Sequence, residues 1–449
     1  MTDTVDVRAA IDGQRGSRYA TFVVAACATA MVVEGYDAQV VAYAAPAIIR
    51  AWHVDRALFG PVFGAALFGY MLGATLLSGL SDRLGRKRVI AFGNIFFGVL
   101  TLASAFATNI SELLTLRFVA GLGLGCSIPA AIALGVEYAP SNRRAFRVSL
   151  LFVGYTIGAA LGGVLTAGLM AQFGWQSAFF FGGGLSIVLG VALLAGLPES
   201  PGFLAMRGGR DREIAAILGR FRPDLGITPQ TRFTLSEPPA GRGLPVRHLF
   251  TEGRALVTCL LWTAFVFSLA SHYFLTSWLP TVLDASGIPL THAVIAGSLI
   301  QAGGAAGSLI VGRMVDRIGM VAIVWAFAVS VPFVVLIGAL GMPEPLLMAV
   351  VTMAGLCLLG GQVGLNGLAG TIYPTFVRAS GAGWALGVGR IGSIMGPVIG
   401  GVLIGEHLSM PALFLFAAIP GALAALVVLV LHATVGSRRV RHTIPSPVA

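Results

Sequence analysis

Long, continuous apolar stretches dominate this 449-residue chain and limit what it can fold into. About a dozen such stretches can be counted, most of them near the roughly 20 residues that a helix needs to cross a bilayer. Hydrophobic residues make up 56% of the chain and charged residues only 11%, too few to coat a water-soluble fold. Membrane β-barrels are excluded, because their strands alternate over about 10 residues and these runs are continuous. The sequence therefore predicts an all-α polytopic membrane protein.

The longest polar segment, residues 198–253, is rich in proline and arginine and separates six apolar spans from six more. Arginines concentrate in alternate connections between spans, which predicts that these connections and both termini are cytoplasmic. We expect a multi-pass protein of the inner (plasma) membrane, with one amphipathic helix in the linker near Asp211 to Arg220. The expected parts are a cytoplasmic N-terminal segment (1–18), an N-terminal six-helix bundle (19–197), a cytoplasmic linker (198–253), a C-terminal six-helix bundle (254–432) and a cytoplasmic tail (433–449).

The net charge of +10 does not indicate nucleic-acid binding, because the arginines sit in short loops between apolar spans. The four cysteines fall in separate apolar segments without metal-ligand spacing, so no disulfide is implied. We expect neither a metal nor another cofactor. The glycine-rich run from Gly121 to Gly125 is not a nucleotide loop, because it lacks the Lys-Ser/Thr ending and the aqueous setting of such a loop.

The two halves of the chain repeat the same features. A charged loop with an Asp-Arg pair follows both the second and the eighth span, at Gly79 to Arg88 and at Gly312 to Gly319. The fifth and eleventh spans carry glycines at the same spacing, namely Gly154, Gly158, Gly162 and Gly163, and Gly392, Gly396, Gly400 and Gly401. Glycines four residues apart form a smooth stripe that lets a neighbouring backbone approach closely. Duplicated halves are typical of transporters, whose substrate site lies between them near the midplane.

These features together resemble the major facilitator superfamily, over essentially the whole chain. Within it, the chain resembles the aromatic acid:proton symporters. The matching motifs are the loop Leu80 to Lys87, Glu34 to Asp37 in span 1, Arg117 to Tyr138 in span 4, Pro198 to Ser200 after span 6, Leu275 to Pro280 in span 7, and Gly387 to Arg390 in span 11. The resemblance implies twelve transmembrane helices in two pseudo-symmetric six-helix bundles. It also implies import of a benzoate-like or hydroxybenzoate-like carboxylate with protons, by alternating access. We expect the protein to act as a monomer.

Two acids stand inside the first span. Glu34 and Asp37 are neighbours on one helix face, and Gly35 between them is expected to loosen the helix. Asp37 lies about 27 Å along its span and Arg117 about 8 Å along the oppositely directed fourth span, so both lie in the outer half. Arg117 is expected to pair with Asp37 or Glu34, and protonation of the acid would release it, a proton-coupling switch. Sugar:proton symporters of the superfamily resemble this arrangement. The alternative is a structural ion pair that never titrates.

Arg390 is the second charge inside the membrane, roughly 15 Å into the eleventh span and hence near the midplane. Its planar guanidinium can bind a substrate carboxylate through two hydrogen bonds. The alternative is an internal salt bridge, but the acids of this half, Asp284, Glu344 and Glu406, are expected near the outer surface.

Two further groups of residues complete the expected sites. Polar and aromatic side chains near mid-depth could line a substrate cavity: Trp278, Gln362, Asn366, Tyr155, Tyr273, Gln301 and Tyr70. For each aromatic, packing against protein or lipid is the alternative. The resemblance implies that residues at the cytoplasmic face form a gate that latches the halves: Asp82, Arg83, Gly85, Arg86, Glu137, Asp316 and Arg317. Glu137 is about 30 Å along its helix from Arg117, too far to join the outer pair, and is expected to contact the arginine-rich loop.

Other functions stay open at this point. The chain could import a non-aromatic organic acid, or more remotely act as a drug:proton antiporter or as a chemosensor for aromatic acids. Arg390 argues against a cationic drug, and Ala159 stands where antiporters typically have a proline after Gly158. An enzyme is not expected, because no nucleophile-base pair or metal cluster stands out in the loops.

Overall fold

The computed structural model describes residues 4–14, 17–77, 79–140, 144–221, 225, 227–228, 231–235, 245–251, 253–339, 341–374 and 377–443. Within these ranges, twelve helices are long and apolar enough to cross a membrane. The prediction of an all-α polytopic protein with twelve spans is therefore confirmed. The chain forms two compact units: unit 1 comprises Met1–Val40, Phe68–Gly162 and Phe173–Arg242, and unit 2 comprises Val41–Leu67, Gly163–Gln172 and Gly243–Ala449.

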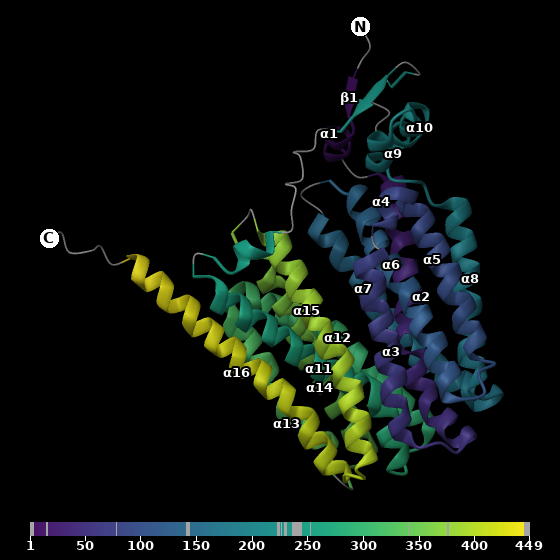
Figure 1. The fold of residues 1–449 in the computed structure, drawn as a ribbon, viewed down its shortest axis with the longest axis vertical. Coiled ribbons are helices and arrows are strands. Elements are labelled where there is room, and N and C mark those ends of the chain that lie inside the picture. The colour runs from purple at the N-terminus through teal and green to yellow at the C-terminus, as the bar shows by residue number, and fades with distance from the viewer. Residues whose placement is uncertain are drawn as a thin grey trace, which may run out of the picture. The chain divides into compact units, whose positions relative to one another are not determined.

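Unit 1 is a helical bundle with a small cap at one end (Figure 1). In it, α5 packs against both α6 and α8. Asn109 begins α6 by accepting the backbone N–H of Glu112, a hydrogen bond that satisfies one of the free donors of a helix N-terminus. The elements wholly within this unit are β1 (Thr4–Asp6), α1 (Val7–Asp12), α4 (Leu80–Leu84), α5 (Arg86–Ser104), α6 (Ile110–Glu137), α8 (Gln176–Gly196), α9 (Pro201–Arg207), α10 (Asp211–Phe221) and β2 (Arg232–Thr234).

Unit 2 is a second bundle, in which α12 packs on α14, α11 on α15, and α13 on α16. Its own elements are the 3₁₀ helices η1 (Arg56–Leu58) and η5 (Pro245–Leu249), and α11 (Ala255–Ala285), α12 (Leu290–Ile318), α13 (Met320–Ile337), α14 (Glu344–Ala369), α15 (Arg378–Gly405) and α16 (Met410–Thr443). Three helices run through both units: α2 (Arg18–Trp52), α3 (Phe59–Leu72), which continues as a π-helical turn (Gly73–Leu77), and α7 (Arg144–Phe173). The predicted bundle limits at 19–197 and 254–432 stay predictions.

The glycine stripes make the same kind of helix contact in both units. Along α7, a methyl group at Gly154 or Gly158 would overlap the backbone of α2 at Ala28 or Val32. Along α15, Gly392 and Gly396 meet the backbone of α11 in the same way, at Val266 and Ala270. The prediction that these stripes allow close helix approach is confirmed. Without a hydrophobic driving force between helices in lipid, such close van der Waals contact is a main source of helix association.

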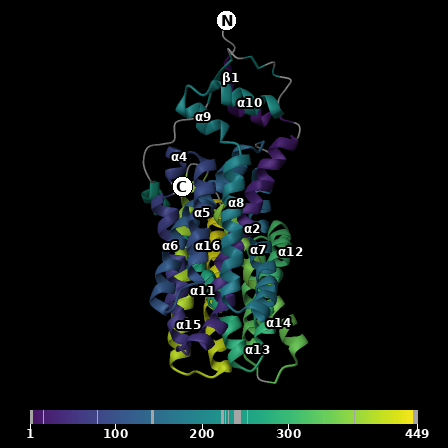
Figure 2. The same ribbon diagram turned by 90° about the vertical axis from the view of Figure 1, so that its right-hand side faces the viewer.

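The cap of unit 1 is built from the N-terminal segment and the linker, as both views show (Figures 1 and 2). β1 and β2 pair in parallel, with Val5 opposite Phe233. The predicted linker helix is present as α10, whereas β1, β2, α1 and α9 were not predicted. Strands of three residues carry too little alternation to be recognised, and their partner lies far away in the sequence. Within the cap, Ser200 begins α9 by accepting the backbone N–H of Phe203 at 2.9 Å.

The glycine contact between α7 and α2 leads to a stability prediction. Gly158→Ala should lower the free energy of unfolding by about 1–3 kcal/mol, because the new methyl group forces the two backbones apart. Gly168→Ala, on the same helix, is the control, since a methyl group there meets nothing within 4 Å. That variant should be neutral or gain up to about 1 kcal/mol from helix propensity. Thermal unfolding of the purified variants in detergent checks both, and equal shifts would contradict the packing role of Gly158.

Candidate functional site

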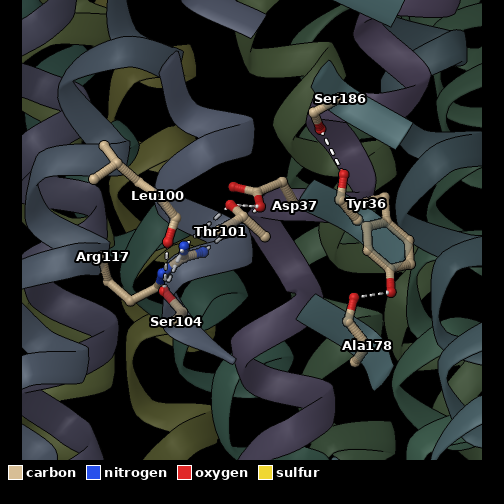
Figure 3. A network of polar contacts seen from close by, with 9 residues as sticks. Tyr36, Asp37, Leu100, Thr101, Ser104, Arg117, Ala178 and Ser186 are labelled. Carbon is tan, nitrogen blue, oxygen red and sulfur yellow. Dashed lines mark hydrogen bonds and ion pairs between the residues drawn. The ribbon is translucent and has the colours of Figure 1, made fainter. Parts of the chain in front are cut away.

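A buried ion pair between α2 and α6 forms the core of the candidate site in unit 1 (Figure 3). Asp37 of α2 is 3% exposed and Arg117 of α6 is 2% exposed. Nη1 of Arg117 lies 3.6 Å from Oδ1 of Asp37. Buried charges are tolerated where a partner of opposite charge offsets their desolvation, so each of these residues stabilises the other. Of the two carboxylates expected as partners of Arg117, the structure places Asp37 beside it.

Two hydroxyl groups of α5 complete the surroundings of the pair. Thr101 donates its hydroxyl hydrogen to Oδ1 of Asp37. Nη2 of Arg117 donates to Oγ1 of Thr101 at 3.0 Å and to Oγ of Ser104 at 2.9 Å. Figure 3 shows this chain of contacts from three helices. The sequence analysis did not identify Thr101 or Ser104; their signal was a pair of hydroxyl residues three apart on one face of an apolar span.

Aromatic side chains fix the orientation of the site. The guanidinium carbon of Arg117 lies 5.6 Å from the ring centroid of Phe179, a cation–π contact with α8. Tyr36, beside Asp37 on α2, donates its hydroxyl hydrogen to the carbonyl of Ala178 at 2.9 Å (Figure 3). The ion pair is therefore held from α2, α5, α6 and α8 at once.

Glu34 lies in a different setting from Asp37, although only three residues separate them. It is fully buried, and its Oε1 accepts a hydrogen bond from Ser127 of α6 at 2.5 Å. Ser127 also accepts a hydrogen bond from the amide of Asn94 of α5 at 3.2 Å. Oε2 of Glu34 has no hydrogen-bond partner among the described residues. The structure thus gives one acid of the motif a cation and the other a set of neutral polar groups.

Gly35 has a role that the sequence analysis did not predict. The expectation that it loosens the helix is wrong, because α2 is continuous from Arg18 to Trp52. A methyl group at Gly35 would overlap the backbone carbonyl of Tyr155 on α7. The glycine therefore permits close contact between two helices beside the ion pair, and the helix hydrogen bonds persist.

A second polar group lies in unit 2, along α11. Nη1 of Arg390 on α15 lies 3.4 Å from the hydroxyl of Tyr273 on α11. One turn earlier on α11, Ser268 donates to Oε1 of Gln362 on α14, whose amide nitrogen donates to Oδ1 of Asn366 at 3.2 Å. Four of the expected substrate-binding residues thus occur in two hydrogen-bonded groups along one helix.

The remaining expected substrate-binding residues are buried or partly buried. Trp278 is fully buried; its indole N–H donates to the carbonyl of Pro397 at 2.8 Å, and its ring packs edge-on against Phe63. Gln301 is 3% exposed, and its Oε1 has no hydrogen-bond partner among the described residues. Tyr70 and Tyr155 are partly buried against the apolar core of unit 1.

The residues expected to form a gate lie at helix ends. In unit 1, Nη2 of Arg86 lies 3.0 Å from Asp82 and 3.2 Å from Glu137. Gly85 adopts φ +100°, and any side chain there would overlap the carboxylate of Glu199. That carboxylate accepts the backbone N–H of Lys87 at 3.1 Å. The side chains of Arg83, and in unit 2 of Asp316 and Arg317, are exposed.

Unit 2 contains an ion pair that the sequence analysis did not predict, between Arg50 at the end of α2 and Asp284 at the end of α11. Asp284 was expected near the outer surface, and no partner was predicted for it. Close by in the chain, Ala57 and Gly60 meet Gly401 of α15. These contacts join the ends of α2 and α3 to helices of the second half of the chain within the same compact unit.

Metal binding has no support in the described part of the chain. It contains no group of three or more histidine, cysteine or acidic side chains that could hold an ion. The chemistry that the described side chains offer consists of ion pairs and hydrogen bonds inside apolar helix bundles.

A family model, sequence relatives and solved structures each match this chain over most of its length. The model of the Major Facilitator Superfamily matches residues 27–375. A gallate transporter of Pseudomonas putida is 37% identical over 95% of this chain and 94% of its own length. The 4-hydroxybenzoate transporter PcaK of Pseudomonas aeruginosa is 36% identical over 97% of this chain and 98% of its own. Among solved structures, the xylose transporter XylE from E. coli superposes with a TM-score of 0.68 at 15% identity, over 91% of this chain and 97% of that one, which shows the fold alone.

The buried pair leads to a prediction about coupling between its members. Arg117→Gln should cost about 3–5 kcal/mol of unfolding free energy, because it leaves the charge of Asp37 buried without a cation. Asp37→Asn combined with Arg117→Gln should cost less than the sum of the two single variants, since it removes both charges. A double-mutant cycle by thermal unfolding in detergent measures this. Strictly additive effects would show that the two side chains do not interact.

Proposed function

Because the chain belongs to the Major Facilitator Superfamily, we propose that it imports a small aromatic carboxylate together with protons by alternating access. Family and relatives consist of transporters, so the prediction of a transporter and not an enzyme is confirmed. The observation that carries the substrate proposal is the similarity, along nearly the whole length of both chains, to transporters of gallate and 4-hydroxybenzoate. We further propose that it acts as a monomer in the inner membrane, with both termini in the cytoplasm.

Arg390 is proposed to bind the substrate carboxylate. A guanidinium holds a carboxylate through two parallel hydrogen bonds, which fix orientation as well as affinity. Its neighbour Tyr273 offers a hydroxyl and an aromatic ring, and the amides of Gln362 and Asn366 offer donors and acceptors for ring hydroxyls. Trp278 contacts Pro397 and Phe63, which favours a packing role over direct contact with substrate.

Glu34, Asp37 and Arg117 are proposed to couple transport to protons. A proton on Asp37 would remove the charge that holds Arg117 and weaken the contact between α2 and α6. Glu34 has neutral partners, and its Oε2 has no hydrogen-bond partner within the described ranges, so it can take up a proton without breaking an ion pair. Glu34 would then serve as a proton acceptor, and the charge of Asp37 would control the contact between α2 and α6.

Ion pairs at the helix ends are proposed to act as latches. Arg86, the first residue of α5, pairs with Asp82 of α4 and with Glu137, the last residue of α6. These helix ends adjoin arginine-rich loops. Arg50 and Asp284 form an ion pair at the C-terminal ends of α2 and α11. In alternating access, the latches of the two sides would break in turn, and each contains one exposed partner, Asp82 in the first and Arg50 in the second.

Transport by the purified protein in proteoliposomes tests the substrate class. We expect uptake of labelled benzoate, 4-hydroxybenzoate and gallate that rises when the outside is made acidic, because inward proton flow would drive the carboxylate in. Uptake of succinate should be weak, since a second carboxylate has no second arginine in the Arg390 group. Succinate uptake above all ring acids would favour the non-aromatic alternative, and uptake that ignores the proton gradient would contradict symport.

Removal of the Arg390 charge tests the carboxylate site. Arg390→Gln should raise the KM for the best ring acid by about 10- to 100-fold, since a charge-assisted hydrogen bond is worth about 1.5–3 kcal/mol. Arg313→Gln, an exposed arginine at the end of α12, is the matched control and should leave KM near its original value. Equal effects of the two variants would mean that only the overall charge matters.

Neutralisation of Asp37 tests proton coupling. Asp37→Asn should still exchange labelled for unlabelled substrate but should not accumulate it against a gradient, because the side chain can no longer change charge. Exchange and uphill uptake are measured in the same vesicles, with Glu213→Gln, an exposed acid of the linker helix, as control. Normal uphill uptake by Asp37→Asn would refute the coupling role.

A further inference from the structure

A cavity of about 670 Å³ lies in unit 1 between its cap and the adjoining helix ends. The cap contributes α1, α9 and Leu235, while the bundle contributes α4 and the ends of α5, α6 and α7. These cap segments lie outside the twelve spans. The cavity is therefore distinct from the polar groups around Arg117 and Arg390. Its wall includes the latch residues Asp82, Arg86 and Glu137, but no ligand has been assigned to it above.

Arg86 gives the cavity a buried cation with spare donors. This side chain is part of the cavity wall, and the residue is only 7% exposed. Its Nη2 contacts Asp82 and Glu137, while Nε and Nη1 have no hydrogen-bond partner among the described residues. Buried guanidinium donors without acceptors are costly, and an anion in the cavity would supply the missing acceptors.

The wall of the cavity carries more positive than negative charge. Besides Arg86, four arginines line it, from α1, α4, α7 and α9, namely Arg8, Arg83, Arg144 and Arg207. Asp82 and Glu137 are the acids in the wall. Arg144 is partly balanced by Asp12 at 3.4 Å, outside the wall. The excess of arginines favours an anionic occupant.

The lining of the cavity also includes apolar side chains and an aromatic ring. Val7, Ile11 and Val136 line it together with Phe203 and Met206. The guanidinium carbons of Arg86 and Arg207 lie 5.5 Å and 5.7 Å from the centroid of the Phe203 ring. Apolar walls combined with a few convergent polar groups, in a volume within about 300–1,000 Å³, are typical of small-molecule sites.

We propose that this cavity binds a small organic anion that has a carboxylate and an apolar body. The carboxylate lies against Nε and Nη1 of Arg86, and the apolar body packs on Phe203 and Met206. Inorganic phosphate lacks the apolar body, and the part of the lining that lies outside the spans favours a dissolved anion over a lipid headgroup. The proposal rests on the proposed function only in the choice of benzoate as the first probe.

Protection of an engineered thiol tests the site in the full-length protein. Met206, which is 55% exposed, is changed to Cys in a background where the exposed Cys259 is changed to Ser. The protein is placed in nanodiscs of phosphatidylcholine, and the rate of maleimide labelling is measured with and without benzoate. At about twice the dissociation constant, benzoate should slow labelling about threefold, because only the free fraction reacts.

Charge variants show whether protection arises in the cavity. Arg8→Gln combined with Arg207→Gln should abolish the protection. The control, Arg88→Gln combined with Arg212→Gln, removes the same charge from exposed residues outside the wall and should keep it. Protection should also persist in Arg390→Gln, where the proposed transport site is disabled. Loss of protection in Arg390→Gln would mean that the signal comes from the transport site and would overturn the proposal, whatever the outcome of the uptake assays.

Other probes separate the possible occupants. Equal protection by inorganic phosphate would refute the need for an apolar body. Protection that appears only when the nanodiscs contain phosphatidylglycerol, and not with benzoate, would assign the cavity to a lipid headgroup and overturn the proposal. No protection by benzoate, or protection that the arginine variants leave unchanged, would also overturn it.

Discussion

A guanidinium buried in an apolar helix bundle requires compensation, and the centre of unit 1 is arranged around that need. Arg117 receives a carboxylate from α2, two hydroxyls from α5 and an aromatic face from α8. Each contact fixes the rotation of one helix about its own axis, because the side chains reach Arg117 from one face only. The ion pair therefore specifies how α2, α5, α6 and α8 pack, whether or not it also titrates during transport.

Close backbone contact is the second constraint, and the chain uses it twice. The glycines of α7 allow the backbone of α2 to approach closely, and those of α15 do the same for α11 at equivalent places of the repeat. At Gly35 the glycine belongs to α2 and the approaching backbone to α7, directly beside the charged residues. The polar site is thus surrounded by tightly packed helices, which exclude water and strengthen the electrostatic contacts inside.

The charged groups of the protein fall into separate classes by their surroundings. Asp37 has a cation and Glu34 has neutral partners, although they share one helix face. Arg390 has a tyrosine hydroxyl. Arg86 has two acids on one nitrogen, and its other nitrogens have no hydrogen-bond partner in the part of the chain that the structure describes. In the transport mechanism that we propose, this separation would allow proton binding, substrate binding and contacts at the helix ends to change independently. The cavity beside Arg86 extends the same principle to the region outside the spans.

Hydropathy determined the twelve spans, the spacing of glycines showed the internal repeat, and the rise per residue of a helix gave the similar depth of Asp37 and Arg117. The sequence was sufficient for these features because hydropathy, residue spacing and helix rise are local properties of the chain. Only the tertiary structure decided which acid meets Arg117, that Thr101 and Ser104 join the pair, and that Gly35 serves packing. Those outcomes depend on how each helix is rotated about its axis, which a nearly uniform apolar pattern does not encode. The cap and its cavity also depended on the fold, since β1 and β2 are short and pair across a great distance in sequence.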